Sequence, residues 1–302
     1  MFAALIKRKQ IMKNLPKVLK YIDPMVDFGF KKIFKESGKK NLIIRPLNAF
    51  FDLNIVDIEI RESELLGLTD EERKASFDMY CTTQDNQSFI IEVQFAQQEF
   101  FMERAIFYSS LTIAHEAKRG PWDFHVQPVF FLGLLNFDLR HLEKDKADPN
   151  QFIHKFSLRE DSTHEQMSRA LRFAFLEIAR FDKTQEECNS FEDKFLYMMK
   201  NLPTFAETPE LWDDDYFQEM MQEAEYANMT EQERWEYALA MKHRWDYQNT
   251  LDYARKEARV EGREEGRVEG RVEVAKELLA DNIPVEAVVK YTGLTEEQVR
   301  AL

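Results

Sequence analysis

Asp78, Glu92 and Gln94 have the types and the spacing that metal-dependent hydrolysis of a phosphodiester can use. Glu92 and Gln94 are two residues apart in the alternating segment 88–95, so on a strand they project from one face. Two carboxylates on neighbouring strands can share a hard divalent cation, with the carbonyl oxygen of Val93 and water completing the coordination. Such an ion would activate a bound water and neutralise phosphate charge, while Gln94 orients the water or a phosphate oxygen. Spacing alone, however, favours an ordinary solvent-facing strand surface.

The two carboxylates can meet only if the strands pair in one particular register. Asp78 lies in the preceding alternating segment, 75–80, and must share a sheet face with Glu92. The residue numbers of two directly opposed positions must then add up to an even number, as 78 and 92 do. This requires an odd number of loop residues or a bulge. A three-residue loop with Asn86 in the left-handed conformation meets this requirement. The sequence therefore predicts a β-hairpin with a defined register.

The segments around this hairpin predict an α/β core. Apolar residues either recur with helical spacing or alternate with period two. The expected elements, in chain order, are a short helix that starts near Asp27, a helix over 39–52, a strand over 55–60, the two hairpin strands, a helix over 100–118 and a buried strand over 126–137. Two further strands, over 152–159 and 171–178, are expected at the sheet edge or as a separate hairpin.

Composition and charge exclude several classes of protein. The formal net charge of −14 argues against a protein that coats nucleic acid non-specifically, although residues 1–45 are basic. The longest apolar run, 126–137, is about half the length of a membrane-spanning helix. The first residues lack the charge order of a secretory signal, and Cys81 and Cys188 lack zinc-binding spacing. We therefore expect a cytoplasmic protein without membrane segments, a disulfide framework or structural zinc.

Several motifs together resemble a known nuclease family. The hairpin segments 76–80 (SFDMY) and 90–94 (IIEVQ) resemble the D…E-x-Q version of the PD-(D/E)XK nuclease core. More narrowly, the chain is similar to the recombination-promoting nuclease and transposase family of that superfamily. Segment 23–34 resembles that family's opening D-x-x-F-K-x-x-F motif, Arg104-x-x-x-Tyr108 recurs after the core, and Glu-Gly-Arg repeats follow near the C-terminus. The combination covers roughly residues 20 to 300 and is more specific than any one motif.

The resemblance implies a restriction-endonuclease-like core (helix, three strands, helix, strand) with a C-terminal helical region. The implied activity is that of a Mg²⁺-dependent endonuclease acting on double-stranded DNA, associated with recombination or mobile DNA. Asp78 and Glu92 match the metal-binding carboxylates of the family. Gln94 falls where the wider superfamily has a lysine, and an amide cannot supply a positive charge. Lys31 or Lys32 is a candidate source of that charge if the first helix packs beside the sheet, and Asp27 is a candidate further contact to the metal or to its ligands.

The auxiliary residues have alternative interpretations. Asp27 is equally suited to the start of a helix as to catalysis. Lys31 and Lys32 are either solvated or, for one of them, directed at DNA. Arg104 and Tyr108, four residues apart, share a helix face, so Arg104 is a candidate for a DNA phosphate with Tyr108 steadying it. Both side chains are equally suited to packing against the sheet.

We divide the chain into five parts. The region after the core contains helices broken at Pro203 and Pro209, and a capping box at Thr295 and Gln298 marks the start of the last helix. The parts are a basic N-terminal extension (1–20), the PD-(D/E)XK nuclease-like core (21–182), a helical subdomain (183–253), a charged Glu-Gly-Arg repeat helix (254–280) and a small helix-turn-helix-like module (281–302). The last helix has a single basic residue, which favours a packing or oligomerisation module over a DNA-reading one.

The repeat helix carries rows of like residues four positions apart. Glycine occupies 262, 266 and 270; arginine occupies 255, 259, 263, 267 and 271; glutamate occupies 257, 261, 265, 269 and 273. Stacked like charges cost a few tenths of a kcal/mol each, and each interior glycine costs about 1 kcal/mol. A second helix that approaches over the glycines, or DNA phosphates that meet the arginine row, would compensate. Self-association into a homo-oligomer is favoured, and a frayed, solvated helix is the alternative.

Two other functions fit the same residues. The missing lysine favours a catalytically inactive protein that keeps the nuclease fold and binds DNA or a partner. The family also suggests a transposase that rejoins strands.

Overall fold

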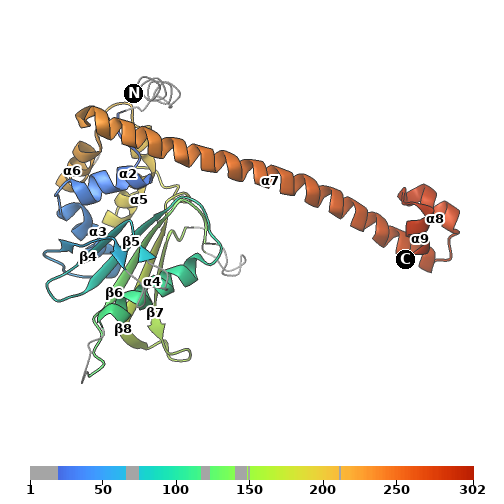
Figure 1. Cartoon of the computed structure of the whole chain (residues 1–302), viewed down its shortest axis with the longest axis horizontal. Helices are drawn as coiled ribbons and strands as arrows, with labels where there is room; N and C mark the ends of the chain where they lie inside the picture. The colour runs from blue at the N-terminus through green and yellow to red at the C-terminus, as the bar shows by residue number, and fades with distance from the viewer. Residues whose placement is uncertain (1–19, 66–74, 117–122, 140–147, 149, 211) are drawn as a thin grey trace. The chain divides into compact units, whose positions relative to one another are not determined.

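Figure 1 shows the computed structural model of the chain, which describes residues 20–65, 75–116, 123–139, 148, 150–210 and 212–302. The predicted basic extension, 1–20, lies outside these residues except for Lys20. The chain forms two compact units, of which the first ends at Met241 and the second is Lys242–Leu302. Within the described residues, no helix combines the length and the apolar character needed to cross a bilayer.

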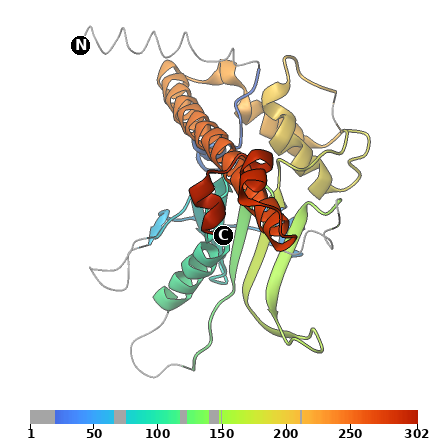
Figure 2. The same cartoon turned by 90° about the vertical axis from the view of Figure 1, so that its right-hand side faces the viewer.

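The first unit is built on a six-stranded mixed sheet with the order β1-β4-β5-β6-β8-β7. The strands are β1 (Glu59–Ile60), β4 (Met79–Thr82), β5 (Ser88–Gln94), β6 (Val129–Leu135), β7 (Ile153–Arg159) and β8 (Gln166–Glu177). β5 and β8 pair parallel to β6, whereas the other pairs are antiparallel. A separate pair, β2 (Glu64–Leu65) and β3 (Ala75–Ser76), precedes the hairpin. The two strands expected after the core therefore join the same sheet, with β8 inserted beside β6 and β7 at the edge (Figure 2).

Helices cover both faces of this sheet. One face packs against helices that come before and after the strands in the sequence. They are α2 (Asp27–Phe30), the π-helix η1 (Lys31–Glu36), α3 (Asn41–Phe51), α5 (Phe191–Asn201) and α6 (Asp215–Ala224). Short 3-10 turns, η2 (Leu202–Thr204) and η3 (Tyr226–Asn228), follow α5 and α6. The other face packs against α4 (Phe101–Glu116). The α/β core predicted from the sequence is thus confirmed, although the strand expected over 55–60 is only two residues long.

Strand β6 shows why this chain needs two helical layers. All seven residues of its sequence, VFFLGLL, are buried, which is typical of a strand covered on both faces. Phe130 and Leu132 belong to the core beneath α3, whereas Phe131 and Leu135 belong to the core beneath α4. Alternation along one strand therefore supplies both cores, and β6 pairs with β5 at the centre of the sheet.

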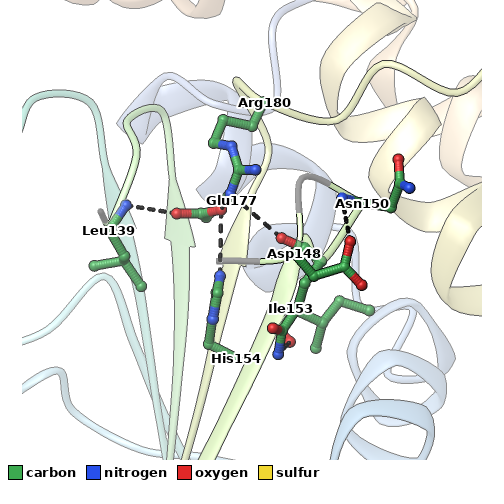
Figure 3. A network of polar contacts seen from close by, with 8 residues as sticks. Leu139, Asp148, Asn150, Ile153, His154, Glu177 and Arg180 are labelled. Carbon is green, nitrogen blue, oxygen red and sulfur yellow. Dashed lines mark hydrogen bonds and ion pairs between the residues drawn. The ribbon is translucent and has the colours of Figure 1, made fainter. Parts of the chain in front are cut away.

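A buried polar network joins the C-terminal end of β8 to the start of β7 and to the chain that follows β6 (Figure 3). Glu177 at the end of β8 is only 1% exposed, and its carboxylate accepts a hydrogen bond from the backbone N–H of Leu139. His154 Nε2 lies 3.2 Å from Glu177 Oε2, and Arg180 forms an ion pair with the same carboxylate. Burial alone would raise the pKa of Glu177, but the contacts with His154, Leu139 and Arg180 outweigh it and lower the pKa. The ionised carboxylate therefore ties together three segments that are distant in sequence.

The second unit is helical. The long helix α7 (Glu231–Ala280) begins in the first unit, runs without a break through residues 253–254, and is followed by α8 (Val285–Thr292) and α9 (Glu296–Arg300). A small apolar core of Ala275, Val288, Leu294 and Val299 packs the last helices together. The predicted capping box is present, because the side chains and backbone N–H groups of Thr295 and Gln298 bond reciprocally. The five-part division of the chain stays a prediction.

Candidate active site

The β4–β5 hairpin has the register that the sequence required. Its outermost pair before the loop is Thr82 with Ser88, and Met79 pairs with Ile91, so that opposed positions sum to an even number. Asn86 adopts a left-handed φ of 56°, and its N–H donates to the carbonyl of Thr83 at 3.0 Å. Thr83 in turn donates to Gln87 at 3.0 Å, which leaves three residues in the loop. The predicted loop is confirmed, and continuation of this register sets Asp78 directly opposite Glu92.

Asp78 is anchored to the partner strand by its own side chain. β4 begins one residue later, at Met79, and Asp78 Oδ2 accepts a hydrogen bond of 2.6 Å from the backbone N–H of Val93. The carboxylate therefore takes the position of a missing backbone acceptor. In an extended strand the N–H and C=O of one residue point to the same edge, so the carbonyl of Val93 faces the edge that carries Asp78.

Glu92 is buried rather than displayed, which corrects the sequence-based expectation of an exposed polar pair. Its exposed fraction is 5%, whereas Gln94 is half-buried. Gln94 Nε2 donates to Glu92 Oε2 at 3.1 Å. The other oxygen, Oε1, is buried and has no hydrogen-bond partner among the residues that the structure describes. A buried acceptor of this kind is costly unless a ligand satisfies it.

Burial also shifts the acidity of both carboxyl groups. It raises the pKa of Asp78 to about 6, and the charge of Asp27 adds to this effect against the opposing influence of the Val93 N–H and Lys31. Burial raises the pKa of Glu92 to about 8, and the neighbouring Asp78 charge adds to it, while Arg104 and Gln94 oppose it. Two neighbouring acids whose pKa values are raised by burial and by nearby negative charge form a site in which a cation can replace protons.

The first helix brings Asp27 and Lys31 to this site. Asp27 lies in the first turn of α2, and Lys31 Nζ pairs with Asp27 Oδ1 at 2.7 Å. Asp27 also hydrogen-bonds the Asp78 side chain, and the charge of Lys31 lowers the pKa of Asp78. Lys31 is the residue at which the α-helix changes to the π-helix η1, a feature that is frequent at functional sites. The first helix therefore packs beside the hairpin and supplies a cation there.

Lys32 is directed elsewhere. Its ammonium group forms an ion pair with Glu233 in the first turn of α7, and both side chains are about one quarter exposed. The hydrogen bond from Lys32 lowers the pKa of Glu233 to about 2. The structure thus separates the two neighbouring lysines, with Lys31 at the carboxylates and Lys32 at the start of α7.

Arg104 and Tyr108 pack as one of the two sequence-based alternatives expected, whereas contact of Arg104 with a DNA phosphate stays a prediction. The Arg104 guanidinium lies over the rings of Phe101 at 5.4 Å and Tyr108 at 5.9 Å, and Tyr108 packs against Phe77. Arg104 Nη1 donates to the side chain of Gln98, whereas Nη2 is buried without a hydrogen-bond partner among the described residues. Since its charge lowers the pKa of Glu92, Arg104 both packs on α4 and acts electrostatically on the site.

Sequence reasoning did not identify Gly133 and Gln98 as parts of the site. Gly133 pairs with Glu92 across β5 and β6, and a Cβ atom there would lie 2.7 Å from the ring of Phe175. A glycine inside an apolar strand is a signal for such a close approach and could have indicated it. Gln98, which accepts from Arg104, carries no comparable signal.

The donor set fits a divalent cation held by two carboxylates. Asp78 and Glu92 are opposed, the carbonyl of Val93 faces the same edge, and Glu92 Oε1 accepts no hydrogen bond from any described residue. No group of three or more His, Cys, Asp or Glu side chains with metal-binding geometry occurs in the described part of the chain. Asp27 therefore does not complete a three-acid site, and hard oxygen ligands beyond the pair would come from backbone and water.

One comparison with known proteins is informative. A family model described as PD-(D/E)XK nuclease family transposase matches residues 24–254. The matched span is more than half of the chain and contains α2, the hairpin and α4. No curated protein and no solved structure shows significant similarity to the chain.

Proposed function

The chain belongs to the PD-(D/E)XK nuclease family transposases, and on this premise we propose that it is a Mg²⁺-dependent endonuclease that hydrolyses DNA phosphodiester bonds. The observation that carries the proposal is the buried pair of opposed carboxylates, Asp78 and Glu92, with Glu92 Oε1 left without a partner among the described residues. A structural acid pair would be expected to satisfy that oxygen internally. The family implies a DNA substrate and an association with recombination or mobile DNA.

Asp78, Glu92 and the Val93 carbonyl would hold the cation. When bound, a divalent cation supplies charge that acidifies water and neutralises the phosphate in the transition state. The protein contributes by fixing the ligands: the Val93 N–H orients Asp78, and Gln94 orients Glu92 so that its second oxygen stays available. These contacts pre-organise both carboxylates before a substrate binds.

Lys31 and Arg104 would supply the positive charge that Gln94 cannot. Lys31 forms an ion pair with Asp27, and its charge lowers the pKa of Asp78. The charge of Arg104, on α4, lowers the pKa of Glu92. The Arg104 guanidinium, whose Nη2 has no hydrogen-bond partner among the described residues, would donate to a phosphate oxygen once DNA is bound, with the Tyr108 ring packed against it. In this proposal, the hydrogen-bonding groups of the Gln94 amide that do not contact Glu92 orient the attacking water.

We further propose that a second copy of the chain pairs with α7. Gly262 and Gly266 are exposed and Gly270 is half-buried, and Cβ atoms added at these positions would meet no atom of the described residues within 4 Å beyond the adjoining turns of the helix backbone. Rows of arginine and glutamate flank it, so two such helices can approach closely and pair opposite charges.

The competing proposal is a catalytically inactive nuclease fold that binds DNA or a partner. The specific observation in its favour is the glutamine at position 94, together with a raised pKa that keeps Glu92 protonated near neutral pH without a cation. A strand-transferring transposase is a third proposal, supported by the family description alone.

Plasmid cleavage separates these proposals. We expect the purified protein to cleave supercoiled plasmid with Mg²⁺ and to stop when EDTA is added. Asp78→Asn and Glu92→Gln should each lower the rate by roughly 1000-fold, because each removes a ligand charge without changing shape. Asp85→Asn, an exposed acid in the loop of the same hairpin, is the matched control and should retain the rate.

Equal cleavage by all four proteins would remove the catalytic assignment. Folded wild-type protein that binds DNA but cleaves neither supercoiled nor linear duplex would support the inactive fold. Joined donor and target products in a strand-transfer assay would support the transposase.

A further inference from the structure

A large cavity lies at the opposite end of the sheet from the carboxylates. Its volume is about 730 Å³, within the usual range of ligand pockets. It is bounded by Gln87 and Pro128, which precede β5 and β6, by the end of α3, and by the β7–β8 hairpin. About five residues of extended chain, roughly 17 Å, separate Gln87 from Glu92.

The cavity also involves the other face of the sheet. Arg172, which lines it, pairs with Phe130 across β8 and β6, on the side that packs under α3. Glu92 lies on the side covered by α4, in line with Ile90 of that core. No residue of the candidate active site lines the cavity, so the two surfaces are distinct.

Cations dominate the walls of this cavity. Four basic residues line it against a single acid, Asp52, in a chain whose net charge is −14. The four are Lys155, Arg159, Arg169 and Arg172. Asp52 is 75% exposed and reaches Lys155 at 3.3 Å and Arg172 at 4.0 Å, so it is a weak surface partner. A concave surface lined by one sign of charge raises the local concentration of oppositely charged ligands.

Arg172 is fixed in place before any ligand binds. Its Nη1 donates to the carbonyl of Phe51 at the end of α3 at 2.7 Å. Its guanidinium also lies over the rings of Phe51 at 5.8 Å and Phe130 at 5.7 Å. A pre-oriented guanidinium loses little conformational freedom when it binds a phosphate.

The remaining arginines, Arg159 and Arg169, lie where the β7–β8 pairing is irregular. The β7–β8 register is regular up to Ser157 with Arg172 and then shifts, with Leu158 opposite Ser168 and Arg159 opposite Gln166. The extra residues on β8 include Arg169, which makes no hydrogen bond or ion pair within the described residues. Bulges of this kind redirect side chains and are frequent beside binding sites. Half-buried Phe156 and Phe173 also line the cavity, although both pack against the core on the α4 face.

We propose that this cavity binds the phosphate groups of a nucleic-acid strand, as a contact separate from Asp78 and Glu92. Guanidinium and ammonium groups match phosphate oxygens in charge and geometry, and aromatic walls accept sugars and bases. The phosphate chemistry follows from the cavity itself, whereas the choice of nucleic acid as its source rests on the proposed function. The cavity anchors a strand outside the cleavage site and raises the affinity of the whole protein for its substrate.

The test measures binding without catalysis. Fluorescence anisotropy of labelled single-stranded and duplex oligonucleotides of about 20 nucleotides is recorded with the full chain in EDTA, from about 50 to 200 mM salt. The test variant is Lys155→Glu/Arg169→Glu. Lys256→Glu/Lys290→Glu is the control, because it changes the net charge equally at exposed residues of the second unit. Lys155→Gln/Arg169→Gln replaces the test variant if circular dichroism shows that charge reversal unfolds the protein.

We expect the test variant to bind at least one of the two oligonucleotides about tenfold more weakly. The slope of the logarithm of its binding constant against the logarithm of the salt concentration should become shallower by about one to two. The control should stay within about twofold of the wild type. Equal affinities and equal salt slopes in test and control variants would overturn the proposal. Inorganic phosphate and unlabelled oligonucleotide are also compared as competitors at equal phosphate concentration. If both displace the labelled oligonucleotide equally well, the proposal that the cavity binds a nucleic-acid strand is overturned. Since no Mg²⁺ is present, a loss of cleavage in Asp78→Asn has no bearing on this result.

Discussion

At the scale of residues, the site depends on holding two acids together in a buried position. Burial raises the pKa of both Asp78 and Glu92, the charge of Asp78 raises that of Glu92 further, and Asp27 adds a third negative charge nearby. Lys31 and Arg104 only partly offset this charge. Ionisation of the two buried acids is therefore unfavourable in the metal-free protein, and a divalent cation would make it favourable. Such an arrangement is typical of functional sites.

The first prediction concerns pH and stability in EDTA. Because the pKa of Glu92 is raised to about 8 and that of Asp78 to about 6, these two groups bind more protons in the folded protein than in the unfolded chain between about pH 4 and about pH 8. The contribution of these groups to the free energy of unfolding should therefore fall as pH rises from about 4 to about 8 and level off above that, and Glu92→Gln should flatten this dependence. Urea unfolding across this range measures it. A stability that rises with pH in the wild type, or an unchanged slope in Glu92→Gln, would contradict the account.

The second prediction separates the two neighbouring lysines. Lys31→Gln should lower plasmid cleavage by about 10- to 100-fold, because it removes the cation that faces Asp78 and holds Asp27. Lys32→Gln should leave cleavage within about twofold, since Lys32 is paired with Glu233. Single-turnover rates measure both. A large loss of cleavage in Lys32→Gln would instead support the sequence-based assignment of Lys32 to DNA.

At the scale of elements, local sequence determined the hairpin well. Alternation, the position of Asn86 and the parity of the register were enough to bring Asp78 opposite Glu92, because these features depend on residues close in the chain. The helices around Asp27 and over 39–52 were also predicted, since their apolar periodicity is strong. The resemblance to a nuclease family supplied what spacing alone could not.

Contacts between distant segments were not predictable from the same patterns. The insertion of β8 between β6 and β7, the pairing of Lys32 with Glu233 and the network around Glu177 each join residues far apart in sequence. Periodicity reports which face of an element is buried, but not which element covers it. For that reason the burial of Glu92, under α4 and beside α2, also escaped the sequence analysis.

The third prediction compares two glycines in helices. A Cβ at Gly29 of α2 would lie 2.0 Å from the backbone oxygen of Asp23, so Gly29→Ala must displace the chain that positions Asp27 and Lys31. We expect it to destabilise the protein by about 1 to 3 kcal/mol and to lower cleavage. Gly262→Ala has open space around it and should stabilise α7 by up to about 1 kcal/mol. Chemical unfolding measures both, and equal effects of the two substitutions would contradict the close approach at Gly29.

At the scale of the whole molecule, the chain combines a nuclease-like unit with a helical unit of different character. The first unit contains a two-faced sheet with buried cores, whereas the repeat segment of α7 is almost entirely exposed. An exposed helix with interior glycines and stacked like charges is poorly stabilised by its own sequence. Self-association would provide the missing contacts.

The fourth prediction tests this association. Gly266→Leu should weaken self-association by about tenfold or more, because a large side chain blocks the close approach of two helices. Val268→Leu is the matched control, since Val268 is exposed on the same helix and already carries a side chain. Sedimentation velocity over a range of concentrations measures both. A wild-type protein that stays monomeric throughout this range would rule out the proposed pairing.

The last prediction addresses the shared metal ion directly. Isothermal titration calorimetry of metal-free protein with Mn²⁺, at a pH of about 8.5 where both acids can ionise, should reveal one site in the wild type and in Asp85→Asn. Asp78→Asn and Glu92→Gln should each abolish that same site, because one ion needs a carboxylate from each strand. Retention of wild-type affinity by either single variant would contradict joint coordination by Asp78 and Glu92.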